Sequence, residues 1–333
     1  MKRYELQRAG GIDALAIAEK PQPQPGPGQV LLRMRAASLN YRDLLISRNR
    51  KEGFPLVPLS DGAGEITAVG AGVTRFKVGD RVAGNFFQNW YDGEQTQAAR
   101  DSALGGAIDG VLTESAVLQE RGVVSLPKGY SFEEGATLPC AAVTVWNALV
   151  EIGKLQKGET VLALGTGGVS VFVLQIAHAF GARVIITSSS DAKLERARKL
   201  GAWQTINYKK TPAWENEVLR LTDGKGVDHV VEVGGAGTLP QSAKATRVGG
   251  WVTLVGLLSG APGKADAAVG AERQLRVQGV YVGSTKMFED MNRFLEQHGI
   301  RPVIDRVFPF EQAKEAYRYL ESGAHFGKVV ISV

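Results

Sequence analysis

Cysteine and histidine are scarce in this chain of 333 residues, which contains one cysteine, Cys140, and four histidines. A single cysteine cannot form a disulfide within the chain, and together with four scattered histidines it cannot build a cysteine-rich zinc cluster. Cysteine-poor proteins without disulfides are typical of the reducing cytosol. We therefore expect a cytoplasmic protein without a structural metal.

Long apolar runs are also absent. The longest candidate, residues 169–180, is far shorter than the about 20 residues that cross a bilayer. Residues 1–6 carry charges, but no apolar segment of the kind found in signal peptides follows them. We therefore expect neither a signal peptide nor a membrane partner.

An excess of charge of one sign is the third missing feature. The chain has 39 Lys and Arg residues against 34 Asp and Glu residues, which gives a formal net charge of +5, and the basic residues are scattered. Clustered basic residues are the usual sign of a nucleic-acid partner. We expect a small-molecule substrate and no nucleic acid, in a globular enzyme long enough for two domains.

A glycine turn is the most informative feature that is present. It follows an apolar strand at residues 159–164 and starts an apolar helix that ends near Phe180. Gly165 allows a sharp turn, Gly167 lets backbone approach a pyrophosphate, and the position of Ser170 requires a small side chain. N–H groups at the helix start then face the anion. We expect the dinucleotide to contact Gly165, Thr166, Gly167, Gly168 and Val169.

Strands and helices alternate from Ser131 onward. Predicted strands lie at residues 159–164, 182–187, 205–208, 227–233, 251–256 and 277–283, with predicted helices at 132–138, 140–152, 168–180, 191–200 and 213–222. This pattern predicts an α/β fold with a Rossmann doubly wound parallel six-stranded sheet.

The other parts of the chain are less regular. Residues 1–127 are predicted to be strands and turns, and the tail has a predicted helix at 310–322 and a last strand that begins at Lys328. The polar stretch 85–110 starts with four aromatic residues. It is either a surface loop pinned by its aromatics or a lid or substrate wall, and the pattern leaves both open.

The second predicted strand bears on the choice of cofactor. In NAD sites an acidic residue about 20 positions after the first glycine accepts the ribose hydroxyls. Here the strand ends in Ser188 and Ser189, and Asp191 follows in a predicted helix N-cap region. Lys193 lies one turn inside that helix. Hydroxyls and a cation suit a 2′-phosphate, so we expect NADP(H) rather than NAD(H); the alternative for Lys193 is an ordinary exposed lysine.

Motifs along the whole chain carry a family resemblance. They lie at residues 28–33, 39–43, 58–66, 78–82, 138–149, 165–170 and 327–330. Together they resemble the medium-chain dehydrogenase/reductase superfamily, and more closely its zinc-free quinone oxidoreductase-like branch. The resemblance implies a GroES-like, mostly-β catalytic domain at 1–140 completed by 285–333, and a Rossmann domain at 141–284. Hydride would move in a cleft between them, and two copies would pair through an edge strand as a homodimer.

The resemblance also bears on zinc. Zinc members of the superfamily hold the catalytic metal with a cysteine, a histidine and a second cysteine. The corresponding positions here are Asn40, Ser60 with its neighbour Asp61, and Cys140. One thiolate cannot hold catalytic zinc, which needs three protein ligands. We therefore expect a zinc-independent enzyme, for which a quinone or α,β-unsaturated carbonyl is an easier hydride acceptor than an unactivated carbonyl.

The resemblance assigns three catalytic candidates, Asn40, Tyr41 and Asp43. Asn40 would donate to a substrate oxygen, Tyr41 would supply a proton or a stacking face, and Asp43 would fix its neighbours. The alternative is a turn held by bonds between side chains and backbone. The family resemblance also implies cofactor contacts at Thr144, Ser188, Ser189, Lys193, Tyr208, Gly234, Gly256, Gly283 and Lys328.

Two rival functions stay open. One is an alcohol dehydrogenase that uses NAD(P). The other is a non-catalytic protein that binds or senses the cofactor.

Overall fold

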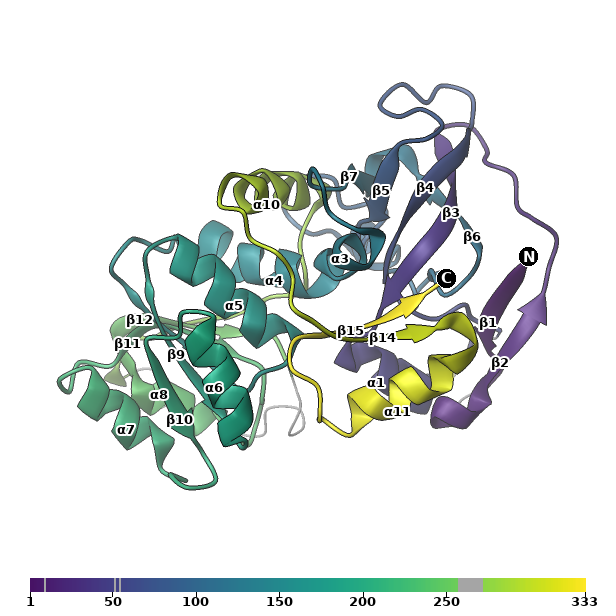
Figure 1. Cartoon of the computed structure of the whole chain (residues 1–333). Coiled ribbons are helices and arrows are strands. Elements are labelled where there is room, and N and C mark those ends of the chain that lie inside the picture. The colour runs from purple at the N-terminus through teal and green to yellow at the C-terminus, as the bar shows by residue number, and fades with distance from the viewer. Residues whose placement is uncertain (9, 51, 54, 257–271) are drawn as a thin grey trace. The chain divides into compact units, whose positions relative to one another are not determined.

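The chain forms two compact units (Figure 1). The computed structural model describes all residues except 9, 51, 54 and 257–271. Unit 1 contains Met1–Val143 and Val282–Val333, so the C-terminal segment joins the N-terminal one, and unit 2 contains Thr144–Tyr281. Among the described residues, no helix has both the length and the apolar character needed to cross a bilayer.

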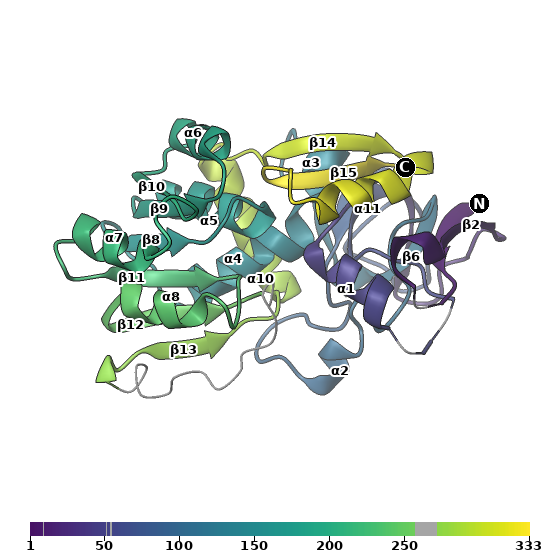
Figure 2. The same ribbon diagram turned by 90° about the horizontal axis from the view of Figure 1, so that it is seen from below.

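A parallel sheet forms the centre of unit 2. Its six strands lie in the order β10-β9-β8-β11-β12-β13, and Figure 2 shows β11, β12 and β13 side by side. This order confirms the predicted doubly wound sheet, with its switch point between the adjacent strands β8 and β11. The strands are β8 (Thr160–Ala163), β9 (Arg183–Ser188), β10 (Gln204–Asn207), β11 (Val227–Glu232), β12 (Thr246–Leu254) and β13 (Arg276–Gly279).

Helices connect and cover these strands. α5 (Gly168–Ala179) packs on β8 and β9, α6 (Asp191–Lys199) on β9 and β10, and α8 (Leu239–Ala245) on β11 and β12. α7 (Trp214–Leu221) packs against α8. Seven of the twelve residues of α5 are buried, as expected for a helix that is apolar almost all round.

The last strand of this sheet is shorter than predicted. We expected residues 277–283, but β13 ends at Gly279. Val282 has a φ of 59°, a left-handed conformation that β-branched residues rarely adopt and that no strand contains. The turn at Val282 therefore ends the extended stretch and begins the second segment of unit 1.

Unit 1 is built on a seven-stranded sheet of mixed direction. Its order is β14-β15-β3-β4-β5-β7, and β6 also pairs with β3. The yellow C-terminal strands of Figure 1 thus continue a sheet begun near the N-terminus. The strands are β3 (Gln29–Ser38), β4 (Asp61–Val69), β5 (Arg81–Gly84), β6 (Ser115–Gln119), β7 (Val123–Ser125), β14 (Ile304–Pro309) and β15 (Lys328–Ser332).

Two helices of unit 1 correct our expectation of strands, turns and a single tail helix. α1 (Tyr41–Asn49) lies where a turn was the alternative, and α10 (Thr285–Gln297) follows Val282. The tail helix is present as α11 (Ala313–Glu321). The buried side chains of α1 include Asp43 and Ser47, so its sequence lacks an apolar stripe. In α10 the stripe is present, at Phe288, Met291 and Leu295, and the prediction overlooked it.

The two predicted helices before the glycine turn are present. α3 (Phe132–Ala136) has the expected cap, because Ser131 Oγ accepts from the Glu134 N–H at 3.1 Å. The second consists of a π-helical turn, Leu138–Ala142, the short α4 (Val143–Trp146) and another π-helical turn, Asn147–Ile152. π-helical turns occur frequently near functional sites.

The stretch 85–110 is anchored by its aromatic start. Phe86 and Phe87 are fully buried, and their ring centroids lie 4.7 Å apart in an edge-on arrangement. The Arg42 guanidinium, from α1, lies 4.6 Å from the Phe86 ring centroid and donates to the Leu104 carbonyl oxygen at 3.1 Å. The only helix described in the stretch is the short α2 (Gln97–Arg100). The pinned-loop interpretation agrees with these contacts.

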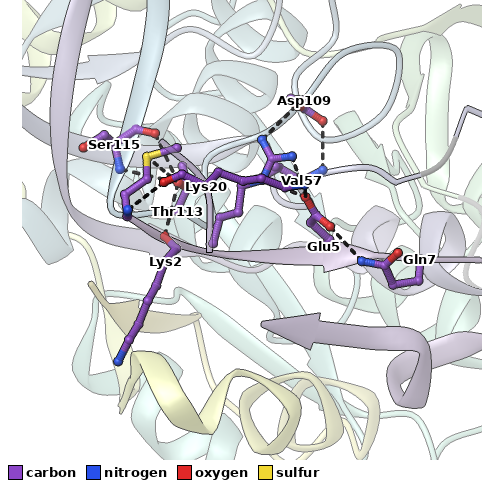
Figure 3. A network of polar contacts seen from close by, with 10 residues as sticks. Lys2, Glu5, Gln7, Lys20, Val57, Asp109, Thr113 and Ser115 are labelled. Carbon is purple, nitrogen blue, oxygen red and sulfur yellow. Dashed lines mark hydrogen bonds and ion pairs between the residues drawn. The ribbon is translucent and has the colours of Figure 1, made fainter. Parts of the chain in front are cut away.

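A small two-stranded sheet, β1 (Lys2–Leu6) and β2 (Leu15–Glu19), completes unit 1. Figure 3 shows the polar network around it. Buried Glu5 accepts from Arg3 Nε at 2.8 Å and from Gln7 Nε2 at 2.7 Å. Asp109, from the end of the 85–110 stretch, accepts from the Val57 N–H at 2.9 Å. The Arg3 guanidinium, from β1, also lies 3.7 Å from Asp109 Oδ2, so this network joins the N-terminal strand to the end of the long loop.

Candidate functional site

The glycine turn of unit 2 leaves a helix start open. Gly165 has a φ of 75°, and its N–H donates to Thr187 Oγ1 at 3.1 Å, which ties the turn to the end of β9. Gly167 is the N-cap of α5 and supplies no side-chain acceptor, whereas Ser190 and Ser284 cap α6 and α10 with their hydroxyls. The first N–H groups of α5 are thus available to an anion, which fits a pyrophosphate.

The small residue after the turn has the packing role that its position requires. Ser170 is buried, and its Oγ donates to the Leu164 carbonyl oxygen at 2.6 Å. The helix therefore lies close against the end of the strand.

Four predicted cofactor residues gather at the ends of β9 and β10. Ser188 lies opposite Asn207 in the register of the two strands, and the Tyr208 N–H donates to the Ser188 carbonyl oxygen at 3.1 Å. The Tyr208 side chain is 41% exposed, so its ring is available to a ligand. Ser189 follows Ser188, and Lys193 lies in the first turn of α6.

Asp191, the acidic residue nearest these four, is already paired. Its carboxylate accepts from Asn207 Nδ2 at 2.7 Å and from Lys210 Nζ at 2.6 Å. Hydrogen bonds from Lys210 and then Asn207 lower the pKa of Asp191. The carboxylate is held toward the end of β10 by an amide and a cation, so much of its negative charge is compensated at this end of the sheet.

Glu232 was missed by the sequence reasoning. It ends β11, is fully buried, and its Oε1 accepts from the Gly234 N–H at 2.6 Å and the Gly235 N–H at 3.0 Å. The hydroxyl of Thr238 donates to the same oxygen at 2.6 Å. The carboxylate therefore fixes the turn that contains Gly234. An acidic residue that ends an apolar strand just before two glycines was the available signal.

Gly256 lies beside that turn. A Cβ at this position would lie 2.4 Å from the Val233 carbonyl oxygen, so the chain after β12 approaches the end of β11 as closely as glycine permits. Thr144 is also in unit 2, buried in α4. Gly283 belongs to unit 1, where a Cβ would lie 2.7 Å from Val143 Cγ1.

The catalytic candidates lie in unit 1, where three neighbouring strands meet. β15 pairs with β3, and β3 pairs with β4. Lys328 begins β15, Asp61 begins β4, and Asn40 follows the end of β3. Because the strands are adjacent, these three side chains converge at one edge of the sheet.

Lys328 is buried at this edge, with 3% of its surface exposed. Its Nζ donates to the Leu39 carbonyl oxygen at 2.8 Å and to Asn40 Oδ1 at 2.7 Å. Asp61 Oδ2 lies 3.8 Å from the same nitrogen. The Lys328 ammonium is thus surrounded by oxygen atoms.

The Asn40 amide has a defined orientation. An ammonium group only donates hydrogen bonds, so the oxygen of Asn40 must face Lys328 and the nitrogen must point elsewhere. Nδ2 is buried and has no hydrogen-bond partner among the described residues. The amide lies near enough to Asp61 to help lower the pKa of that carboxyl, although no bond of acceptable geometry joins them.

Asp61 connects this group to Cys140. Its Oδ1 accepts from Ser60 Oγ at 2.7 Å, and its Oδ2 accepts from the Cys140 N–H at 3.2 Å. Burial raises the pKa of Asp61 despite the opposing effect of Lys328. Burial, and then the Asp61 carboxylate, raise the pKa of the Cys140 thiol.

Asp43 holds the start of α1. It is buried, and its Oδ2 accepts from the Asn40 N–H at 2.7 Å. Burial raises the pKa of Asp43 to about 6, against the opposing charge of Arg42. Asn40 and Asp43 thus form a capping box at the start of α1, and the Asn40 oxygen also accepts from Lys328. Tyr41 is the first residue of α1 and is 38% exposed.

Comparison with known proteins identifies the family. Residues 26–128 match the family model of the alcohol dehydrogenase GroES-like domain, and residues 168–297 match that of the zinc-binding dehydrogenase. A zinc-type alcohol dehydrogenase-like protein of Schizosaccharomyces pombe is 49% identical over 92% of this chain and 91% of its own length. The chain belongs to the medium-chain dehydrogenase/reductase superfamily.

Two further members of the superfamily are similar over the whole chain. The quinone oxidoreductase of Pseudomonas aeruginosa is 32% identical over 99% of both chains. A solved structure described as an NAD-dependent alcohol dehydrogenase has a TM-score of 0.91 and 37% identity, and covers 100% of both chains. Unit 1 therefore contains a GroES-like domain, and unit 2 is the Rossmann-like domain of this superfamily.

The superfamily includes zinc enzymes, so the fit of zinc to these residues matters. The residues that correspond to the zinc ligands of the superfamily do form one cluster with Lys328. They are Asn40, Ser60, Asp61 and Cys140. However, no three His, Cys, Asp or Glu side chains in the described part of the chain gather as metal ligands. A buried ammonium bonded to Asn40 also repels a dication. This donor set does not fit zinc.

Proposed function

We propose that this protein is a zinc-independent, NADP(H)-dependent oxidoreductase that transfers hydride to an activated acceptor. The acceptor is a quinone or an α,β-unsaturated carbonyl compound. The observation that carries the proposal is the bond from the Lys328 ammonium to Asn40, in a cluster where related zinc enzymes have metal ligands. A fixed cation and an amide can assist an acceptor that is already electron-poor.

The chemistry of such acceptors suits these residues. When hydride reaches the β-carbon of an enone, or a ring position of a quinone, negative charge develops on a carbonyl oxygen. The Asn40 amide can donate to that oxygen, and the positive charge of Lys328 lies directly behind the amide. NADPH would supply the hydride, and a proton from water or from the Tyr41 hydroxyl would complete the reduction.

NADPH is favoured over NADH by the ends of β9 and β10. Ser188, Ser189, Lys193 and Tyr208 lie there, and hydroxyls and a cation are the partners that a 2′-phosphate needs. The pairing of Asp191 with Lys210 reduces the repulsion that its carboxylate would exert on the phosphate.

An alcohol dehydrogenase is the second candidate. The names of the Schizosaccharomyces pombe relative and of the similar solved structure favour it, and the latter is described as NAD-dependent. The name of the Pseudomonas aeruginosa relative, a quinone oxidoreductase, favours the first candidate. A protein that binds the cofactor without catalysis is the third.

Activity assays on protein treated with a metal chelator separate the three candidate functions. The purified protein is dialysed against a strong chelator and assayed with NADPH or NADH on quinones and enones, and with NADP⁺ or NAD⁺ on simple alcohols. We expect turnover of quinones or enones that survives chelation and prefers NADPH. Alcohol oxidation that chelation abolishes would support the dehydrogenase, and tight NADPH binding without any turnover would support the non-catalytic protein.

We also propose a homodimer paired through β13. This strand is at the edge of the six-stranded sheet, and its four residues are exposed, with Val277 at 51%. An exposed edge strand is a template for pairing with another strand. Light scattering on a Val277→Asp variant should report the monomer if β13 pairs two copies, and an unchanged dimer would contradict this arrangement.

A further inference from the structure

We propose that Lys328 is a positioning residue, which fixes Asn40 with its amide nitrogen as the hydrogen-bond donor to the carbonyl oxygen of the acceptor. This inference rests on the proposed function. Lys328 Nζ already donates to the Leu39 carbonyl oxygen and to Asn40 Oδ1, so we infer that it acts through Asn40 rather than by touching the acceptor.

The orientation of an asparagine amide is usually ambiguous, since its two ends have the same shape. Here two charged groups select the same orientation. The Lys328 ammonium bonds to Oδ1 at 2.7 Å, and the Asp61 carboxylate lies near the amide and is stabilised by it. A flipped amide would place its N–H groups against the ammonium and its oxygen toward the carboxylate. Lys328 therefore determines that Asn40 is a donor.

The donor made available in this way has the Asp61 carboxylate as a neighbour but makes no hydrogen bond of acceptable geometry with it. Nδ2 is shielded from water and has no hydrogen-bond partner among the described residues. The capping box of α1 uses the side-chain oxygens of Asn40 and Asp43 as acceptors, so it does not engage this amide nitrogen. A buried amide without an acceptor is costly, and an acceptor oxygen would remove that cost. The acceptor is thus recognised by its carbonyl oxygen.

Lys328 is itself held in place. Its second bond, to the Leu39 carbonyl oxygen at 2.8 Å, comes from the end of the strand next to its own. The negative charge that balances it belongs to Asp61, at 3.8 Å. A fixed charge behind the amide polarises the N–H bond, and this effect grows as negative charge develops on the acceptor oxygen. Lys328 should therefore affect kcat more than NADPH binding.

Single substitutions test the charge. Lys328→Met should lower kcat for a quinone or enone by about 100-fold, because an Asn40 amide that is no longer held in place stops donating to the developing oxyanion, and losing one such donor typically costs that factor. NADPH affinity, measured by fluorescence titration, should change by less than about threefold, which corresponds to about 0.7 kcal/mol. Lys328→Arg keeps a charged donor and should recover part of kcat. Lys2→Met, at an exposed lysine of the same unit, should match the wild type.

A double-mutant cycle tests the route through Asn40. If Lys328 acts by orienting Asn40, Asn40→Ala combined with Lys328→Met should be no slower than Asn40→Ala alone. Losses that multiply in the double variant, or a kcat of Lys328→Met equal to the wild type, would overturn the proposal. If Lys328→Met does not fold, Asp61→Asn/Lys328→Met removes both charges together and takes its place, with Asp61→Asn as its reference.

A readout without turnover separates this proposal from the proposed function. In ¹⁵N-labelled protein, the side-chain NH₂ signal of Asn40 is assigned by its loss in Asn40→Asp. Lys328→Met should shift that signal strongly, and Lys2→Met should not. An unshifted signal overturns the positioning role. Absence of any wild-type turnover with a shifted signal leaves the orientation intact and overturns the reaction instead.

Discussion

Lys328 and Asp61 form a buried ion pair in unit 1, with Nζ 3.8 Å from Oδ2 and side-chain exposures of 3% and 0%. Removing one partner of such a pair leaves an uncompensated buried charge, and typically costs about 3–5 kcal/mol. Lys328→Met should therefore lower the free energy of unfolding by about 3 kcal/mol or more. Urea unfolding measures this, and Lys2→Met serves as the exposed control.

The double variant of that pair gives a sharper result. Asp61→Asn/Lys328→Met leaves no buried charge unpaired, so it should be more stable than Lys328→Met alone. If the double variant is the less stable of the two, the pair is not coupled in the way that its geometry indicates.

Asp43 should give the protein a distinctive pH dependence. Burial raises the pKa of Asp43 to about 6, from its usual value of 3.8. Between these two pH values the folded state holds a proton that the unfolded state has lost. The contribution of Asp43 to stability is therefore fully present below the lower value and is lost as the pH rises to about 6.

Asp43→Asn isolates this contribution. Its free energy of unfolding should fall less than that of the wild type as the pH rises from 4 to 7, by about 2–3 kcal/mol. The other groups around this carboxyl, Arg42, Lys328, Asp61 and Tyr317, are the same in both proteins. Urea unfolding at the two pH values checks the difference, and parallel pH curves for the two proteins would contradict it.

Cofactor preference should depend on Lys193. If its ammonium meets the 2′-phosphate, Lys193→Ala should weaken NADPH binding by about tenfold or more, the worth of one charge-assisted hydrogen bond. NADH binding should not change. Lys199→Ala, at an exposed lysine in the last turn of the same helix, is the control. Equal losses for NADPH and NADH would mean that Lys193 does not read the phosphate.

Gly256 should not tolerate a side chain. A Cβ there would lie 2.4 Å from the Val233 carbonyl oxygen, which is backbone and cannot turn aside. Gly256→Ala should lower stability by about 1–3 kcal/mol and weaken cofactor binding by moving the turn held by Glu232. At Gly279 a Cβ meets nothing within 4 Å, so Gly279→Ala should be nearly neutral. Thermal unfolding with and without NADPH compares the two, and similar effects would contradict the close approach.

Most of unit 2 could be predicted from the sequence. The strands β8, β9 and β11 contain short apolar runs, and turn formers or a helix cap follow them, as at Gly165 and Ser190. The glycine turn was recognisable because a strand precedes it and a helix follows it. The boundary of the last strand was not, because the positive φ of Val282 has no local sequence signal.

The cluster in unit 1 was only partly predictable. Asn40, Ser60, Asp61 and Cys140 were singled out by their positions in motifs, but the bond from Lys328 to Asn40 joins residues 288 positions apart. It depends on β15 pairing with β3, which is a property of the folded sheet. α1 was missed for a different reason, since its buried face carries Asp43 and Ser47 instead of apolar side chains.

The most direct test of the central claim follows the hydride itself. The chelated enzyme is supplied with an enone and with NADPH that carries deuterium at the transferable position of the nicotinamide, and the product is analysed by mass spectrometry and NMR. Our account predicts one deuterium at the β-carbon of a saturated product whose carbonyl group is intact. Deuterium on a carbinol carbon, or transfer only after zinc is restored, would contradict it.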